Sequence, residues 1–527
     1  MRQPGAVPRF DAGRRWARHP RVALRPEPFG ALAYHYDNRR LAFLTSPVLV
    51  EVVRSLGEHP TAAAAVAAVG PANEAQLLGA LSRLAEMDLI VAVEPEGPEP
   101  APSPGAPAPA PGGTGSGSNG DRLGLGSPRR GSKERPTRLR TRLAGGLGAP
   151  ICLTWELTYA CNLACVHCLS SSGTRDPREL TAGEARSVVD DLAAMGVFYV
   201  NVGGGEPLLR PDFFDLVGYA VERGVGVKFS TNGSRLTAAR AARLTAMDYV
   251  DVQVSLDGAT AEVNDRVRGV GSYRAARRAM DNLASAGFGP FKISVVVTRH
   301  NVGQLDELEA LARVYGAQLR LTRLRPSGRG ADSWHRLRPT AEQQRDLYRW
   351  LRERPEVLTG DSFFHLSAFG EALPGLNMCG AGRVVCLIDP VGDVYACPFV
   401  IHDEFRAGNV RDAGGFAALW RNSARFGALR EPASAGACSS CGAYDACGGG
   451  CMAAKFYTGI PLDGPDPECV LGHGAPALAA VPERQRPHPG PGHSKAARRG
   501  PGVRPVPVHF ARLPVAEGAS VPEASGG

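Results

Sequence analysis

Eleven of the twelve cysteines in this chain of 527 residues stand in three closely spaced groups. The first group follows a C-x3-C-x2-C pattern, and the third begins with a C-x2-C-x5-C-x3-C pattern. The groups are Cys161, Cys165 and Cys168; then Cys379, Cys386 and Cys397; then Cys438, Cys441, Cys447 and Cys451, with Cys469 after them. Thiolates at such short spacings are typical of metal ligands, either for zinc or for iron–sulfur clusters.

The number of cysteines in each group bears on the choice of metal. Structural zinc sites take four protein ligands and leave no position open. The first group offers three cysteines, which predicts a [4Fe–4S] cluster with one open iron that can bind a small molecule. The remaining eight cysteines make two full sets of four, enough for two closed clusters. Structural zinc for these eight and a disulfide framework stay open as alternatives.

The expected compartment bears on the disulfide alternative. Met1–Pro20 is polar and rich in arginine, without the apolar segment of a secretory signal. No stretch approaches about 18 consecutive apolar residues, so no membrane span is expected. We therefore expect a cytoplasmic protein in a reducing compartment, where clustered cysteines bind metal.

Composition divides the chain, which is too long for a single ordinary domain. Residues 96–148 are rich in Pro, Gly and Arg and predict a disordered linker, and residues 480–527 predict a disordered tail. The segments 101–150 and 481–527 together carry a charge of +10, against +8 for the whole chain. The other residues are therefore slightly negative, and no specific nucleic-acid partner is expected. Three folded regions remain, at 1–95, 149–330 and 331–475.

Strand and helix patterns alternate in the second folded region. Apolar, β-branched runs predict six strands, and helical periodicity predicts most of the segments between them. Thr181 followed by Glu184 is typical of a helix capping box. The alternation favours an α/β fold with a parallel sheet, either a partial barrel or an open doubly wound sheet. The predicted strands are Ile151–Leu157, Val197–Val202, Val225–Ser230, Tyr249–Ser255, Phe291–Thr298 and Gln318–Leu324.

A motif follows each of the first four predicted strands. The cysteine loop 161–168 follows the first, Gly203–Pro207 the second, Ser230–Gly233 the third and Ser255–Gly258 the fourth. Each of the last three motifs is, by itself, typical of an ordinary turn. In both architectures, however, functional residues gather at the carboxyl ends of parallel strands. The joint placement of the motifs therefore predicts one functional site.

The C-x3-C-x2-C loop after the first strand and the GGEP segment after the second resemble the radical S-adenosylmethionine (SAM) superfamily. The resemblance implies a partial (β/α)6 barrel, in which Cys161, Cys165 and Cys168 hold a catalytic [4Fe–4S] cluster and SAM chelates its open iron. It further implies cofactor-binding roles for Gly204, Gly205, Glu206, Ser230, Asn232 and Ser255. His167 occupies a position that is often aromatic in the family, where it would shield the cluster.

The later cysteines resemble the SPASM extension of this superfamily, because Cys379, Gly392 and Cys397 match its C-x(9–15)-G-x4-C pattern. The resemblance implies two auxiliary clusters, and thus three [4Fe–4S] clusters in all. It assigns Cys379, Cys386, Cys397 and Cys451 to one auxiliary cluster and Cys438, Cys441, Cys447 and Cys469 to the other. From the residues themselves, Asp389–Asp393 predicts a hairpin turn. If Asp389 pairs with Val394, Cys386 lies opposite Cys397.

Residues 1–95 predict a small, winged-helix-like α+β domain with short strands and three helices. Its last helix, Glu74–Met87, carries only Arg83 as a basic residue, which disfavours DNA reading. The stretch from Trp16 to Leu44 resembles the mycofactocin peptide chaperones, a group of peptide-recognition elements in ribosomal peptide pathways. The resemblance implies a domain that holds a leader peptide by adding it as an edge strand.

The segments LTWELTYACNLACVHCLSSSG and MCGAGRVVCLIDPVGDVYACPF resemble the mycofactocin radical SAM maturases, over roughly 151–475. In that family, chaperone and maturase are usually separate chains, whereas they are joined here. The resemblance implies oxidative decarboxylation of the C-terminal tyrosine of a small ribosomal precursor peptide and its carbon–carbon crosslinking to the penultimate valine. It also implies an electron donor such as a flavodoxin or ferredoxin. The alternatives are another SPASM-type modification, such as thioether crosslinking or sulfatase-type maturation, and a redox-sensing iron–sulfur protein.

Overall fold

The computed structural model describes residues 9–38, 40–93, 143, 145–360, 362–431 and 436–482. Most of the predicted linker and nearly all of the predicted tail at 480–527 lie outside these ranges.

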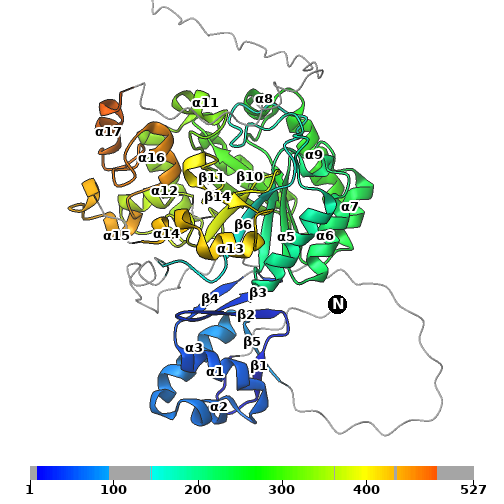
Figure 1. Ribbon diagram of the computed structural model, residues 1–527, viewed down its shortest axis with the longest axis vertical. Coiled ribbons are helices and arrows are strands. Elements are labelled where there is room, and N and C mark those ends of the chain that lie inside the picture. The colour runs from blue at the N-terminus through cyan, green and yellow to red at the C-terminus, as the bar shows by residue number, and fades with distance from the viewer. Residues whose placement is uncertain are drawn as a thin grey trace, which may run out of the picture.

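Six parallel strands form the central sheet (Figure 1). They are hydrogen-bonded in chain order, each to the next, so the order never reverses as it would in a doubly wound sheet. The first of them pairs on its other side with a later strand, and the six-stranded sheet does not close on itself. This partial (β/α)6 barrel confirms the predicted fold class. Its strands are β6 (Cys152–Glu156), β7 (Tyr199–Gly203), β8 (Gly226–Thr231), β9 (Val250–Ser255), β10 (Lys292–Val297) and β11 (Gln318–Arg323).

Helices cover the outer face of the barrel (Figure 1). Alternate strand residues such as Leu153, Trp155 and Val200 point outward and share one apolar core with these helices. Thr181 and Glu184 form the predicted capping box at the start of the first helix. The sequence patterns did not predict α8, because charged residues occupy half of its positions. The helices are α5 (Ala182–Ala194), α6 (Phe213–Glu222), α7 (Ala238–Thr245), α8 (Ala261–Arg268), α9 (Ser272–Ser285) and α10 (Leu305–Val314).

Three further strands extend the sheet beyond β6. β12 (Val385–Ile388) runs parallel to β6, and β13 (Asp393–Tyr395) and β14 (Arg406–Asn409) continue antiparallel. The helices that follow β11 accompany this extension (Figure 1), and two of them lie in the segment that carries the last five cysteines. They are α11 (Gly330–Leu337), α12 (Ala341–Glu353), α13 (Gly415–Asn422), α14 (Ala424–Arg430), α15 (Tyr444–Cys447), α16 (Met452–Thr458) and α17 (Gly474–Ala480).

The hairpin between β12 and β13 differs from the prediction by one residue. Ile388 pairs with Val394, and the N–H of Asp389 donates to the carbonyl oxygen of Asp393 at 2.9 Å. The loop therefore has three residues, and the last of them, Gly392, has a φ of 89°, the left-handed conformation that such loops require. Extending this register places Cys386 opposite residue 396, so the predicted pairing of Cys386 with Cys397 is wrong.

The N-terminal region forms a small α+β domain with its own apolar core. Strands β2, β3 and β4 make an antiparallel sheet, and β1 pairs with β5, two strands that the sequence analysis did not predict. The elements are β1 (Trp16–Arg18), β2 (Val22–Glu27), β3 (Gly30–His35), β4 (Leu41–Leu44), α1 (Pro47–Ser55), α2 (Ala62–Val69), α3 (Glu74–Glu86) and β5 (Ile90–Ala92).

The three-stranded sheet of this domain packs on the barrel at the end where the barrel strands begin (Figure 1). Tyr34 stacks on Phe198, just before β7, with ring centroids 5.0 Å apart. The hydroxyl of Tyr36 donates to the carbonyl oxygen of Gly224, just before β8, at 3.0 Å. Leu143 and Leu147 are buried in the same apolar cluster. The end of the predicted linker is thus folded rather than disordered, because its leucines fill this interface.

A buried ion pair fixes the same contact. Arg25 and Glu27 bind each other at 2.7 Å, and their side chains are almost fully buried. The guanidinium of Arg25 also donates to the carbonyl oxygens of Ala149 and Pro150, both at 2.8 Å. Glu27 accepts the N–H of Gly148 at 2.8 Å. Since these partners lie just before β6, and Arg25 also reaches the carbonyl oxygen of Gly196 before β7 at 3.4 Å, the domain is held on the barrel base rather than carried on a free tether.

Removing Arg25 should release the N-terminal domain from the barrel. The Arg25→Ala variant leaves Glu27 as an unpaired buried charge, a defect that costs about 3–5 kcal/mol. After cleavage at a protease site inserted between residues 110 and 120, the two pieces of this variant should separate on size exclusion. Those of the parent and of Arg54→Ala, whose pair with Glu51 is exposed, should stay together. Co-elution of the Arg25→Ala pieces would show that the ion pair does not hold the domain.

Candidate functional site

The first three cysteines lie on the loop that leaves the carboxyl end of β6, at the opposite end of the barrel from the N-terminal domain. Burial raises the pKa of the Cys161 thiol to about 12, and the nearby thiols of Cys165 and Cys168 raise it as well. Burial also raises the pKa of Cys165. The Cys161 and Cys165 thiols therefore favour the neutral form unless a positive partner lies beside them, which a metal centre supplies.

The glycines after β7 pack against the backbone of the cysteine loop. The N–H of Gly205 donates to the carbonyl oxygen of Thr158 at 2.7 Å, and that of Glu206 donates to Ala160 at 2.8 Å. Gly204 has a φ of 113°, and a Cβ there would lie 2.5 Å from the carbonyl oxygen of Thr158. A Cβ on Gly205 would collide with the carbonyl oxygen of Ala160. Both positions therefore require glycine for the two segments to meet.

Glu206 joins the second and third strand-end motifs. Its carboxylate is fully buried and accepts hydrogen bonds from the N–H groups of Leu208 and Asn232 and from the hydroxyl of Thr231. Burial raises the pKa of Glu206, and these hydrogen bonds oppose the rise. The side-chain amide of Asn232 then donates to Asn162 on the cysteine loop at 3.1 Å. The predicted residues Gly204, Gly205, Glu206 and Asn232 are thus brought together around the loop.

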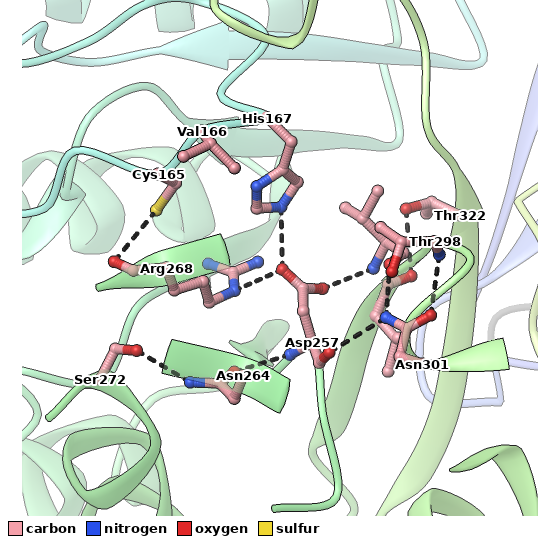
Figure 2. A network of polar contacts seen from close by, with 12 residues as sticks. Cys165, Val166, His167, Asp257, Asn264, Arg268, Ser272, Thr298, Asn301 and Thr322 are labelled. Carbon is pink, nitrogen blue, oxygen red and sulfur yellow. Dashed lines mark hydrogen bonds and ion pairs between the residues drawn. The ribbon is translucent and has the colours of Figure 1, made fainter. Parts of the chain in front are cut away.

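His167 lies on the cysteine loop and binds the fourth strand-end motif (Figure 2). Its Nε2 lies 2.8 Å from the carboxylate of Asp257, which also accepts the guanidinium of Arg268 at 2.6 Å. Burial disfavours the ionised form of Asp257, but Arg268 and His167 hold its pKa well below the usual range. The carbonyl of Arg268 lies 3.8 Å from the Cys165 sulfur. This network anchors the cysteine loop to β9 and α8.

The other two predicted strand-end residues, Ser230 and Ser255, are half-buried at the ends of β8 and β9. Ser230 pairs with Gln253, and Ser255 pairs with Ser294 on β10. Both positions alternate with residues of the outward-facing core, so the two hydroxyls face the barrel interior.

Sequence reasoning missed three site residues. Asp257 was visible as an acid directly after a buried strand, but its partner Arg268 lies on the unpredicted α8. Glu156, the last residue of β6, is 2 % exposed, and burial raises its pKa to about 8, with Asp389 adding to the rise. Its position at the end of a strand was the available signal, because a buried carboxyl there faces the site.

The remaining cysteines fall into two spatial groups. Burial raises the pKa of the Cys397 thiol, and the neighbouring thiols of Cys379 and Cys451 raise it further. Burial likewise raises the pKa of Cys386, with contributions from Cys152 and then Cys397. The thiols of Cys379, Cys397 and Cys451 are therefore neighbours, and Cys386 lies near Cys152 and Cys397. The second group, Cys438, Cys441, Cys447 and Cys469, lines a single cavity together with His365 and Asp466.

Three family models match the chain, in the order of its three folded regions. The Peptide chaperone MftB family matches residues 15–91, the Radical SAM superfamily residues 155–312, and an iron–sulfur cluster-binding domain residues 379–442.

Curated relatives are similar at high identity. Mycofactocin maturase MftC of Mycobacterium ulcerans (strain Agy99) is 68% identical over 364 residues, which cover 68% of this chain and 98% of that protein. Mycofactocin maturase MftC of Mycobacterium tuberculosis (strain CDC 1551 / Oshkosh) is 65% identical over 380 residues, which cover 72% and 96%. The chain belongs to the mycofactocin maturase family.

Membership makes the chain a radical SAM enzyme whose cofactors are [4Fe–4S] clusters and SAM. It also implies a precursor peptide as partner, since a peptide-chaperone domain precedes the barrel. Streptococcus suis SuiB bound to S-adenosylmethionine shares the fold, with a TM-score of 0.58 at 15% identity over 83% of this chain and 96% of SuiB. Among the described residues, no helix is long and apolar enough to cross a membrane.

The thiols of the described residues do not stand as close together as ligands of one zinc ion would. All twelve cysteines lie in the described ranges, and none forms a disulfide. Four thiolates on one zinc ion at about 2.3 Å would stand within about 4 Å of one another. No three cysteine sulfurs in the described parts of the chain lie within 4.8 Å of one another.

Replacing Gly205 by alanine should disable the SAM site. The new Cβ must push Ala160 and with it Cys161, so conversion of SAM to 5′-deoxyadenosine should fall more than tenfold, about 1.4 kcal/mol or more in the barrier. Gly203→Ala is the matched control, since a Cβ at Gly203 meets no atom within 4 Å. High-performance liquid chromatography of the nucleoside product measures both variants. Equal activity of Gly205→Ala and Gly203→Ala would refute the role of the backbone contact.

Proposed function

We propose that this enzyme oxidatively decarboxylates the C-terminal tyrosine of a small ribosomal precursor peptide and then joins that end to the penultimate valine by a carbon–carbon bond. The observation that carries the proposal is an identity of 65–68% to mycofactocin maturases along nearly their whole length. Thioether crosslinking and sulfatase-type maturation are disfavoured, because the enzymes that perform them share the cysteine pattern without this identity. A redox sensor is disfavoured because it has no need of the strand-end residues.

We propose that Cys161, Cys165 and Cys168 hold the cluster that binds SAM. Gly204, Gly205, Glu206, Ser230, Asn232 and Ser255 would form the SAM pocket around it. The carboxylate oxygens of Glu206 are already engaged by Leu208, Thr231 and Asn232. Glu206 therefore contributes its backbone to the pocket and fixes the loop with its side chain. His167, tied to Asp257, covers one side of the cluster.

When bound, the reduced cluster and SAM supply a 5′-deoxyadenosyl radical. The chain's own residues position the peptide and exclude water. Decarboxylation to an alkene removes one hydrogen atom from the tyrosine Cβ, one electron and CO2. The hydrogen leaves on 5′-deoxyadenosine, so the electron needs an acceptor. Two auxiliary cysteine groups would hold [4Fe–4S] clusters, whose chemistry allows them to accept this electron. One group is Cys379, Cys386, Cys397 and Cys451, and the other is Cys438, Cys441, Cys447 and Cys469.

Delivery of the peptide falls to the N-terminal domain. We propose that an edge strand of its β2–β3–β4 sheet pairs with the precursor's leader, because an exposed edge offers unpaired backbone groups to an extended peptide. A flavodoxin or ferredoxin would reduce the first cluster. Clustered cysteines that hold iron–sulfur clusters support a cytoplasmic location, because a reducing compartment keeps the thiols from forming disulfides.

The iron content should report the three sites separately. The reconstituted parent should contain about twelve irons per chain, four for each [4Fe–4S] cluster. The Cys161→Ala, Cys165→Ala, Cys168→Ala triple variant should lose about four irons and all SAM cleavage, and Cys438→Ala, Cys441→Ala should lose about four irons from the auxiliary set. Cys152→Ala is the control and should keep all twelve, because Cys152 belongs to none of the groups. About four irons plus bound zinc in the parent would contradict the assignment.

Abstraction of deuterium from the tyrosine Cβ should transfer it from the peptide to 5′-deoxyadenosine. A precursor peptide ending in Val-Tyr, with the tyrosine deuterated at Cβ, should yield 5′-deoxyadenosine that carries one deuterium, together with a decarboxylated peptide. A peptide deuterated on the tyrosine ring is the control and should yield unlabelled nucleoside. Mass spectrometry of both products decides the matter. Unlabelled nucleoside from the Cβ-labelled peptide, with the peptide still converted, would place hydrogen abstraction elsewhere.

A further inference from the structure

A buried arginine touches the sulfur of one auxiliary cysteine. Arg325 follows β11 in the loop that leads to α11, and it is 7% exposed. Its Nε donates to the sulfur of Cys451 at 3.4 Å. The guanidinium also lies over the ring of Phe399, 3.8 Å from its centroid, and donates to the carbonyl oxygen of Arg323 at 3.2 Å. These contacts fix both the position and the orientation of the positive charge.

The partner of Arg325 is held from a second side. The backbone N–H of Cys451 donates to Asp466 at 2.8 Å. Asp466 and Glu468 in turn bind Arg323, which is buried, through contacts of 2.6 Å. Arg323 therefore pairs with both carboxylates, and neither of them needs Arg325 as a counter-ion. No ion pair involving Arg325 is found among the described residues, so its charge is directed at Cys451.

A second arginine of the same loop serves as a comparison. Arg329 donates to the carbonyl oxygens of Cys165 and Ser172, at 2.9 and 2.8 Å. It thus binds the backbone of the first cysteine loop, whereas Arg325 binds a sulfur. The loop 325–330 therefore contacts both the first cysteine group and the group that contains Cys451, by different chemistry.

We propose that Arg325 is a positioning residue that raises the reduction potential of the auxiliary cluster held by Cys379, Cys386, Cys397 and Cys451. The proposal rests on the ligand assignment proposed above. Reduction adds one negative charge to such a cluster, and a cationic hydrogen-bond donor on a ligand sulfur stabilises that added charge. The site is buried, so the effect is weakly screened. A higher potential makes this cluster the better acceptor of the electron that the peptide gives up when CO2 is lost.

The test is an EPR-monitored redox titration of the reconstituted full-length chain. It is run on the Cys161→Ala, Cys165→Ala, Cys168→Ala background, which leaves only the two auxiliary couples. Arg325→Met removes the charge and the donor at similar length, and Arg325→Gln keeps a neutral donor. Arg338→Met is the matched control, because it removes a guanidinium that lies over the ring of Trp334, 4.4 Å from its centroid.

Arg325→Met should lower the potential of one auxiliary couple and leave the other unmoved, Arg325→Gln should lower the same couple by less, and Arg338→Met should move neither. Unmoved potentials in an Arg325 variant that retains its iron would overturn the proposal, as would an equal shift of both couples. If Arg325→Met fails to hold its cluster, Arg325→Gln decides by the same criterion. Absence of two auxiliary couples in the background chain itself would instead refute the ligand assignment.

Discussion

The close approach of two backbones at the barrel mouth organises the whole site. Gly205 and Glu206 donate hydrogen bonds to the backbone that leads from β6 into the cysteine loop, and neither Gly204 nor Gly205 has room for a side chain. Glu206 continues from this contact to β8, and the pair of His167 with Asp257 continues to β9. Four neighbouring strand ends are thereby joined to one loop. A parallel barrel makes this possible because all its strands end at the same rim.

The two ends of the barrel have separate tasks. The rim where the strands end carries the first cysteine group, and the base where they begin carries the N-terminal domain (Figure 1). Strands of five or six residues span about 17–20 Å, so the two ends of the barrel are about that far apart. Under the delivery proposed above, a precursor bound at the base would span this distance to reach the rim. Attachment of the domain to the base would give the leader a fixed starting point.

Much of the barrel was predictable because local chemistry determines it. The Thr181 capping box, the six strands and the strand-end motifs follow from short-range patterns, and the structure confirms these elements. The predicted pairing of Cys386 with Cys397 is wrong because the hairpin loop is one residue shorter than the prediction assumed, and hydrophobic alternation does not determine the length of a loop. The sequence patterns did not indicate Arg268 as a site residue, because it lies on α8, whose residues are mostly polar and show no apolar periodicity. The contact of Tyr34 with Phe198 joins residues far apart in sequence, for which a single chain offers no local signal.

The central claim is that the loop of Cys161, Cys165 and Cys168, held by the glycines after β7, places SAM on the open iron of its cluster. Electron–nuclear double resonance on the reduced enzyme, with SAM labelled by 15N at the amino group and 13C at the carboxylate, tests this most directly. If SAM binds the open iron through these two groups, both labels should show hyperfine coupling to the cluster spin. A reduced enzyme that binds and cleaves SAM without coupling from either label would contradict it.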